Sequence, residues 1–311
     1  MKRYDDNLRF RQMTDALAVV QIVRGKVLQL IHKFFLENDF ALVDPPILHE
    51  HIPNKKHEIY LPLYDGRYSL NSSNALYMAA SAALLGKVYA ISPTFRDELD
   101  SINHLVEFRM LEVEMPGICY RELPDFVESI LIFLLKELSA LPEIRRRPLL
   151  CQRIESLLES FPFRRVTYED FVRELGHADG CRLRSGLDLS EIDYMVSAYI
   201  ESPVFVMDYP QSLASWTAKQ QGDVGACALN LILPETYGEL CEGCERTNDV
   251  ALLRRKIECV GIDNLQWYLS AVEHIHAPRC GFGIGVDRLV RWIAGTAHIM
   301  DTVLFPRMKL R

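Results

Sequence analysis

The chain has 311 residues, 49% of them hydrophobic, and a formal net charge of −7 at pH 7. This length and composition suit one large enzyme domain, and the mild acidity disfavours extensive contact with nucleic acid, whose ligands present clustered Lys and Arg. The sequence contains no run of about 18 apolar residues, so it predicts no membrane-spanning helix. Residues 1–7 lack the apolar core of a signal peptide. We therefore expect a cytoplasmic protein with no membrane partner.

The first third of the chain predicts two helices around a short strand. Residues 11–39 carry apolar side chains at helical spacing, which indicates one long amphipathic helix. A strand follows over residues 41–48, and then a polar loop over residues 49–67. Residues 74–86 form an Ala-rich helical segment that ends at a glycine.

The next segment predicts two strands joined by a loop with a definite charge order. Residues 88–92 are β-prone and Pro93 ends the first strand; the return strand lies within residues 107–114. Arg96 can pair with a phosphate in a bidentate manner, and Glu98 can accept from an exocyclic amine. Phe108 offers an adenine a flat apolar face. The alternative is an ordinary hairpin whose charges lie on its surface.

The middle of the chain predicts helices first and strands afterwards. In chain order we expect two helices over residues 121–160 broken near Pro142, a helix start at 166–170, strands over 203–246 and helix over 248–273. The run Arg145-Arg146-Arg147 fits a solvated helix face better than a tRNA-binding patch.

A glycine-rich segment near the C-terminus predicts a strand that leads into a helix. Gly281, Gly283 and Gly285 alternate, which leaves one face of the strand bare so that a flat ligand can lie against the backbone. Asp287 and Arg288 fall in the first helical turn. The alternative is a glycine-rich turn without a ligand, since such a pattern alone is weak.

The eight cysteines fit free thiols in a reducing cytoplasm. Cys241 and Cys244 have metal-ligand spacing, and Cys227 and Cys280 could join them at a zinc site. A single Cys-x-x-Cys is weak support for zinc. We favour small buried thiols.

Together, these segments resemble the signature motifs of the class II aminoacyl-tRNA synthetases. Residues 95–98 and 104–108 read Phe-Arg-Asp-Glu and His-Leu-Val-Glu-Phe, which resemble the second motif; residues 281–288 resemble the third. The motifs span about 28–48, 88–115 and 279–294, and the resemblance covers about 15–307. Residues 203–210, 237–240 and 298–307 resemble the asparaginyl and archaeal-type aspartyl branch.

The resemblance implies an α+β fold with an antiparallel β-sheet flanked by helices, in a single catalytic domain over residues 1–311. It implies a homodimer built around the first motif. Because the helix of that motif begins near residue 15, we expect no anticodon-binding OB-fold before it. The chain thus resembles stand-alone asparagine-synthetase-like paralogs of this branch.

The resemblance also implies residue roles. Arg96 would hold the α-phosphate of ATP and the reacting carboxylate, and Arg288 would reach the γ-phosphate; we expect these two to be catalytic. The other ATP-binding residues would be Glu98 on the adenine amine, Phe108 stacked on the adenine opposite Arg288, His104 at the terminal phosphates, and Gly283 and Gly285 beneath the nucleotide. Glu239 would hold Mg²⁺, which prefers hard oxygen ligands. Arg246 would meet the substrate side chain.

Several positions depart from the family pattern. The segment that contains Ser73 aligns with a substrate-binding helix, but Ala75 replaces its Gln and Met78 replaces the Lys that helps to bind aspartate. Asn230 replaces a metal-side Asp, and Asn103 replaces an Arg. Glu242 replaces a Ser or Gly, and it could either restore the charge around the metal or accept from a substrate ammonium.

These features leave three classes of function. The first is an adenylate-forming ligase, using ATP and Mg²⁺, that transfers an activated amino acid to a small amine, with aspartate plus ammonia as the leading case. The second transfers the aminoacyl group to tRNA, a protein or a biosynthetic intermediate; the net charge and the short, acidic second-motif loop disfavour tRNA. The third is a non-catalytic regulator that binds an amino acid, which a complete set of ATP-binding residues disfavours. The sequence does not name the amino acid or the acceptor.

Overall fold

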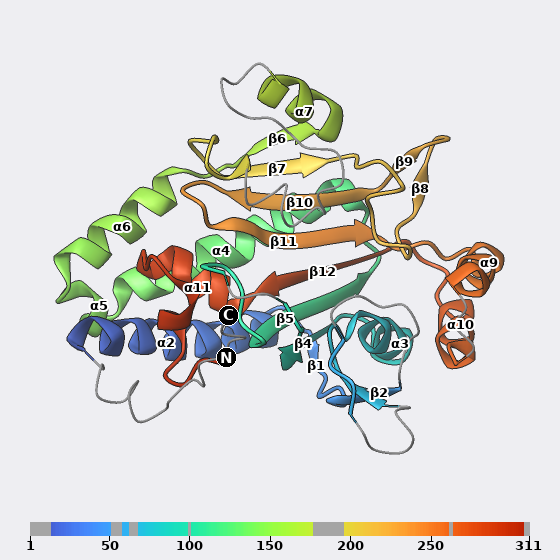
Figure 1. Ribbon diagram of the computed structural model, residues 1–311, viewed down its shortest axis with the longest axis horizontal. Coiled ribbons are helices and arrows are strands. Elements are labelled where there is room, and N and C mark those ends of the chain that lie inside the picture. The colour runs from blue at the N-terminus through green and yellow to red at the C-terminus, as the bar shows by residue number, and fades with distance from the viewer. Residues whose placement is uncertain are drawn as a thin grey trace.

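The computed structural model describes residues 14–50, 58–61, 68–98, 101–176, 196–260 and 264–307. Its centre is one eight-stranded sheet in the order β1-β4-β5-β12-β11-β10-β7-β6 (Figure 1). In that order the strands are Ala41–Leu42, Val88–Phe95, Glu107–Pro116, Arg279–Gly285, Gly238–Glu245, Ala228–Leu233, Val204–Met207 and Arg164–Thr167. The outermost pair at each edge is parallel and the other pairs are antiparallel. This is the α+β fold, with a mainly antiparallel sheet flanked by helices, that the sequence predicted.

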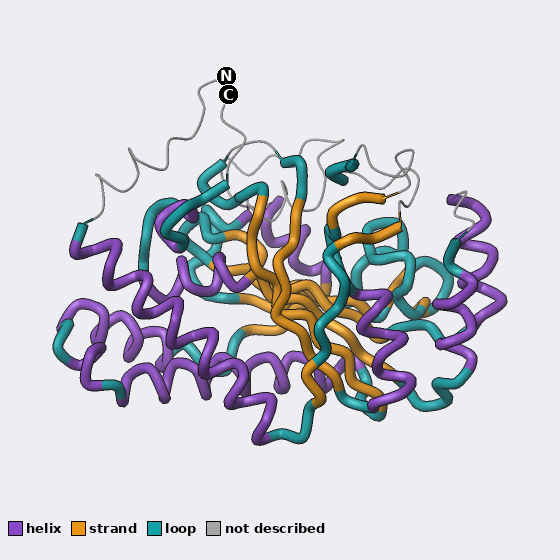
Figure 2. The backbone as a smooth tube through the Cα atoms, turned by 90° about the horizontal axis from the view of Figure 1, so that it is seen from below, coloured by secondary structure: helices purple, strands orange, loops and turns teal. Residues whose placement is uncertain are grey.

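Helices cover one face of this sheet and build the main core. They are α2 (Asp15–Glu37), α4 (Leu123–Ala140), α5 (Pro142–Arg145), α6 (Pro148–Glu159) and α11 (Val286–Ala294). Apolar side chains from these helices and from the central strands form a single buried cluster that includes Phe35, Ile130, Leu231 and Trp292. Figure 2 shows these helices along one side of the strands, with loops on the opposite side.

Smaller elements surround the opposite face. They are α3 (Ala75–Leu85), α7 (Tyr168–Gly176), α9 (Val250–Val260), α10 (Gln266–Glu273), and the strand pairs β2–β3 (Leu48–Glu50, Tyr68–Leu70) and β8–β9 (Gln220–Gln221, Gly225–Ala226). The 3-10 segments Tyr120–Glu122 and Ile299–Thr302 lie beside the main helical layer, the first against α4 and the second against α2 and α11. None of the helices in these described ranges is long and apolar enough to cross a bilayer.

The first-motif helix α2 shows how local sequence sets an element. The side chain of Thr14 caps it by accepting from the backbone N–H of Leu17 at 3.2 Å. Val23, Val27 and Ile31, each four residues after the one before, are fully buried and attach the helix to the core. The predicted helix over 11–39 is therefore confirmed over Asp15–Glu37, while residues 11–13 lie outside the described part of the chain.

Four sequence predictions need correction. Pro93 does not end β4, which continues to Phe95; β1 pairs with β4 only at Val88 and Tyr89, so the missing N–H of Pro93 breaks no ladder. The strand predicted over 41–48 is split into β1 and β2 around two prolines, and β2 takes the start of the predicted polar loop. Residues 121–160 break a second time before Pro148. Residues 248–273 form two helices, α9 and α10.

Candidate active site

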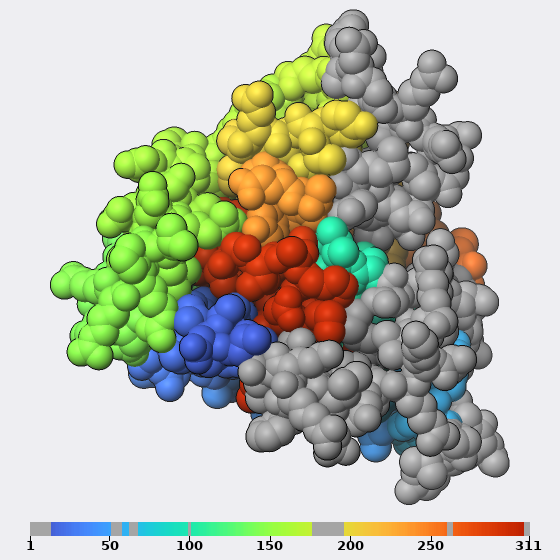
Figure 3. All heavy atoms as spheres, turned by 60° about the vertical axis from the view of Figure 1, so that its left-hand side comes forward, coloured from blue at the N-terminus to red at the C-terminus, as the bar shows by residue number. Residues whose placement is uncertain are grey.

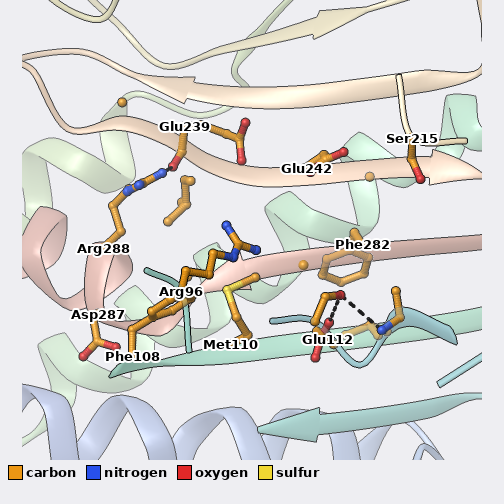
Figure 4. A pocket seen from close by; sticks show the side chains of 18 of the residues that line it. Arg96, Phe108, Met110, Glu112, Ser215, Glu239, Glu242, Phe282, Asp287 and Arg288 are labelled. Carbon is orange, nitrogen blue, oxygen red and sulfur yellow. Dashed lines mark hydrogen bonds between the residues drawn. The ribbon is translucent and has the colours of Figure 1, made fainter. Parts of the chain in front are cut away.

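The predicted site residues line one pocket of about 380 Å³ on the sheet face opposite the main helical layer. These are Ser73, Met78, Arg96, Glu98, His104, Phe108, Glu239, Glu242, Arg246, Gly283, Gly285 and Arg288. Strands β5, β12 and β11 form its floor (Figure 4). Residues as far apart in the chain as Ser73 and Arg288 therefore meet in one cavity, although their individual roles stay predictions.

One end of the pocket is built around Arg96, which directly follows β4. Its guanidinium lies 5.4 Å from the centre of the Phe108 ring, and its Nε donates to the carbonyl of Ser72 at 3.2 Å. Its Nη1 is 3.8 Å from the carboxylate of Glu98. Arg96 thus already stacks on the ring that we expect an adenine to cover, with its charge directed into the pocket (Figure 4).

Arg288 enters the same end of the pocket from the first turn of α11. It donates to the backbone carbonyl of Glu239 in β11 and, at 3.4 Å, to that of Asn103 in the β4–β5 loop. His104 lies on that loop, where its Nδ1 is 2.6 Å from the hydroxyl of Ser101. One strand and one loop therefore hold the second candidate phosphate ligand, Arg288, in the same pocket as Arg96.

Two of the three alternating glycines of β12, Gly283 and Gly285, line the pocket. A Cβ atom at Gly281 would lie 1.9 Å from Oε2 of Glu114 and 2.4 Å from Nη2 of Arg246. A Cβ atom at Gly283 would lie 2.9 Å from the methyl carbon of Met110. The absence of side chains in β12 is what lets charged groups from the neighbouring strands approach each other above it.

A β-bulge brings Glu239 and Glu242 to the same pocket. In β11, Cys241 pairs with Leu231 and Glu239 with Ile232, so Leu240 is an extra residue. In a regular strand, residues three apart face opposite sides, but here both carboxylates line the cavity (Figure 4). Glu239 accepts from the side-chain amide of Asn230 at 2.9 Å. Burial and the nearby Glu239 raise the pKa of Glu242, and Arg246 and Arg96 oppose that rise.

Two acidic residues that the sequence analysis left without a role complete the other end of the pocket. Glu112 accepts from the hydroxyl of Ser73 at 2.8 Å and from both nitrogens of Asn74. Glu114, fully buried, lies 2.8 Å from Arg279 and 3.4 Å from Arg246. Their even numbering, shared with Phe108, was the available signal, because alternate residues of a strand share one face.

Arg246 joins this end through three contacts. Besides Glu114, its Nη1 donates to the hydroxyl of Thr217 at 3.1 Å and to the sulfur of Cys244 at 3.0 Å. Met78 is almost fully buried at the N-terminal part of α3, where it adds an apolar wall. The substrate end therefore offers one anchored guanidinium, one carboxylate pair and an apolar surface.

Glu239 and Glu242 could hold a magnesium ion only together with the phosphates of a bound nucleotide. Mg²⁺ is usually held by one or two carboxylates together with substrate phosphates, and Glu239 and Glu242 can supply such carboxylates. Among the described residues, no group of three or more His, Cys, Asp or Glu could hold a metal. Cys241 packs into the main core while Cys244 lines the pocket, so this Cys-x-x-Cys is not arranged to share one ion.

Comparisons with known proteins agree with this geometry. A family model described as tRNA synthetases class II (D, K and N) matches residues 3–309. The asparaginyl-tRNA synthetase of Pyrococcus horikoshii, complexed with asparaginyl-adenylate, aligns at 27% identity with a TM-score of 0.85, over 98% of this chain and 71% of that chain. The asparaginyl-tRNA synthetase of Entamoeba histolytica, also with asparaginyl-adenylate, aligns at 20% identity with a TM-score of 0.82, over 100% and 73%. The aspartyl tRNA synthetase of that organism aligns at 21% identity with a TM-score of 0.76, over 98% and 62%.

Proposed function

This chain belongs to the class II tRNA synthetases (D, K and N), and from that premise we propose that it activates the carboxylate of an amino acid with ATP and transfers the acyl group to a small amine. Aspartate plus ammonia is the leading case. The observation that carries the proposal is the pocket in which Arg96, Phe108 and Arg288 lie at one end and Arg246 lies at the other. Such a shape suits a nucleotide joined to a small amino acid.

Activation is an in-line displacement at the α-phosphate, so the protein contributes position and charge. Arg96 would bind the α-phosphate and the attacking carboxylate together, which neutralises the charge that repels them. Phe108 would stack on the adenine, and Glu98 would accept from its amine. Arg288 would exchange its hydrogen bonds to the carbonyls of Glu239 and Asn103 for the terminal phosphate.

A bound Mg²⁺ would supply charge neutralisation at the phosphates. Glu239 would hold it from β11, because its carboxylate lies beside Arg288 at the phosphate end of the pocket (Figure 4). Asn230 orients that carboxylate through its side-chain amide. The residues of this chain would therefore provide one firm oxygen ligand, and the phosphates would provide others.

The substrate end favours a short polar amino acid. The guanidinium of Arg246 can donate to a carboxylate or an amide, and its contacts with Glu114 and Thr217 hold it in one orientation. Met78 replaces the second cation that the aspartyl enzymes of the family use, which reduces the preference for a free side-chain carboxylate. Aspartate, asparagine and close analogues are thus the first substrates to test.

Transfer to tRNA is the alternative that the family match favours, because the matching structures are of tRNA synthetases. We prefer a small amine, because the β4–β5 loop has no Lys or Arg between Arg96 and Arg109, and phosphate recognition draws much of its affinity from such cations. A purely regulatory role is disfavoured by the complete set of candidate ATP ligands in the pocket.

The proposal is tested by pyrophosphate exchange into ATP across all standard amino acids, followed by product analysis. We expect exchange with at least one of aspartate and asparagine, and release of AMP and pyrophosphate. Release of ADP and phosphate would contradict an adenylate. Incubation with labelled amino acid, ammonium and total tRNA then separates acceptors: a new amide supports our proposal, whereas label that precipitates with tRNA and is released by mild base supports the alternative.

A further inference from the structure

Two glutamates face each other across a bare strand in the pocket. Glu242 of β11 pairs in register with Gly283 of β12, and Gly283 pairs with Glu112 of β5. Residues in register point to the same face of a sheet, and neighbouring strands are about 4.8 Å apart, so the two backbones stand about 10 Å apart. Because Gly283 has no side chain, the three residues form a trough with one carboxylate on each wall (Figure 4).

The two carboxylates differ in their surroundings. Glu112 is only 5% exposed, and Ser73 and Asn74 donate to it through a hydroxyl and two nitrogens. Glu242 is open to the solvent in the pocket. In the described part of the chain, neither a hydrogen bond nor an ion pair reaches its carboxylate. The carboxylate of Glu112 is therefore already held by hydrogen bonds, whereas the carboxylate of Glu242 is available to a ligand that enters the pocket.

The electrostatic setting of Glu242 favours a cation. The negative charge of Glu239 raises the pKa of Glu242, and the positive charges of Arg246 and Arg96 lower it. Both arginines have other partners: Arg246 contacts Glu114 and Thr217, and Arg96 donates to the carbonyl of Ser72. A pocket carboxylate that has no hydrogen-bond or ion-pair partner in the described part of the chain gains a favourable charge interaction when a cationic ligand arrives.

The proposed reaction brings two amino groups to this trough. The amino acid carries its own ammonium, and the acceptor carries a second one, which must reach the acyl carbon from solvent. Glu242 lies between the end marked by Arg96, where the reacting carboxylate is proposed, and Ser215 (Figure 4). Being open to the pocket, it is the carboxylate that a solvent-borne amine can reach.

We propose that Glu242 is the binding site for the incoming small amine, held as its ammonium form beside the acyl carbon, while the wall of Glu112 and Ser73 faces the amino group of the amino acid. This inference rests on the proposed transfer to a small amine. In that step the nitrogen forms a bond to the acyl carbon and the bond from that carbon to the phosphate oxygen breaks. The ammonium first gives one proton to solvent, which frees the lone pair that forms this bond; AMP leaves with the electron pair of the broken bond, and the nitrogen then gives a second proton to solvent.

The test is Glu242→Gln, which keeps the size of the side chain and removes its charge. Amide formation is measured against ammonium concentration, and pyrophosphate exchange is measured against amino acid, ATP and Mg²⁺. We expect the KM for ammonium to rise at least tenfold more than the KM for the amino acid or for ATP. Methylammonium should show the same shift, because it presents the same charge.

Glu239→Gln serves as the matched control on the same strand, and we expect it to raise the Mg²⁺ requirement instead. Three results for Glu242→Gln would overturn the inference: an ammonium KM within twofold of the unmodified enzyme, a rise confined to the amino-acid KM, or a rise confined to the Mg²⁺ requirement. If the unmodified enzyme exchanges pyrophosphate but forms no amide with any amine, the acceptor in the proposed function is wrong and the inference falls with it. If the unmodified enzyme forms the amide and Glu242→Gln does not change the KM for ammonium, the proposed function is supported and the inference about Glu242 is wrong.

Discussion

Arg291 in helix α11 donates a hydrogen bond to the side-chain oxygen of Asn103 in the β4–β5 loop. Both residues are nearly fully buried. Arg291 also donates to the carbonyls of Thr236 and Ala297, and its guanidinium lies 4.7 Å from the centre of the Tyr237 ring. Figure 3 shows these segments meeting on one face: the C-terminal segment in red, the turn between β10 and β11 in orange, and the loop in teal.

The first prediction concerns this pair. Asn103→Ala should raise the KM for ATP, by about tenfold, with a smaller effect on the KM for the amino acid. The reason is that the carbonyl of Asn103 accepts from Arg288, so a displaced loop moves a candidate phosphate ligand. Stability should fall by about 1–3 kcal/mol, because Arg291 loses a buried acceptor. Pyrophosphate exchange and denaturant unfolding measure the two effects.

Asn103→Asp is the conservative control for that prediction. It keeps the oxygen that accepts from Arg291 and loses the amide that donates to Thr236 at 3.1 Å. We expect it to restore most of the affinity for ATP. Equal increases in both KM values for Asn103→Ala would mean that the pair stabilises the fold without positioning Arg288.

A second prediction concerns the transition state of activation. Arg96→Ala should lower amino-acid-dependent pyrophosphate exchange by about 10²–10³-fold, the usual cost of removing one group that stabilises developing charge. Arg96→Lys should recover only part of this, since Lys lacks the planar pair of donors. The matched control is Arg109→Ala on the neighbouring strand β5, which does not line the pocket. Retention of full exchange by Arg96→Ala would contradict the proposed role.

A third prediction uses the glycines. Gly281→Ala should destabilise the protein by about 1–3 kcal/mol through overpacking, because its Cβ atom would collide with Glu114 and Arg246. It should also weaken amino-acid binding, since Arg246 must move. Gly25→Ala in α2 is the control: nothing lies within 4 Å of its Cβ atom, so the helix should gain about 0.5–1 kcal/mol. Denaturant unfolding measures the stability change of each variant. If both variants are stabilised or both are destabilised, the predicted collision at Gly281 is contradicted.

The fourth prediction is a symmetric homodimer around residues 33–48. Leu36, Leu42 and Leu48 are all exposed in the single chain, and a two-fold interface around residues 33–48 would bury them. Light scattering should give twice the 35.8 kDa mass of one chain. Leu42→Asp should shift the protein toward monomer and lower exchange activity together. A fully active monomer of the unmodified chain would exclude the dimer as a requirement.

The sequence, through its family resemblance, predicted the fold class, and all of the residues that it assigned to the site line the pocket. Phe-Arg-Asp-Glu and the alternating glycines are local patterns, and local patterns fix which side chains a strand end or a helix start can present. The same logic placed α2 and α3, whose spacing and end signals lie within a few residues. The strand end predicted at Pro93 was wrong. A proline ends a strand only where its missing N–H would have bonded to an adjacent strand, and the local sequence does not show where the adjacent strand lies.

Only the tertiary structure decided how the charges of the site are paired. Glu239 and Glu242 are three residues apart and would face opposite sides of a regular strand; the extra residue in β11 puts both in the pocket. Glu112 and Glu114 become interior groups because Ser73, Asn74, Arg246 and Arg279 come to them from other elements. Register between strands that are more than a hundred residues apart is set by packing of the whole sheet against its helices, and no local pattern contains it.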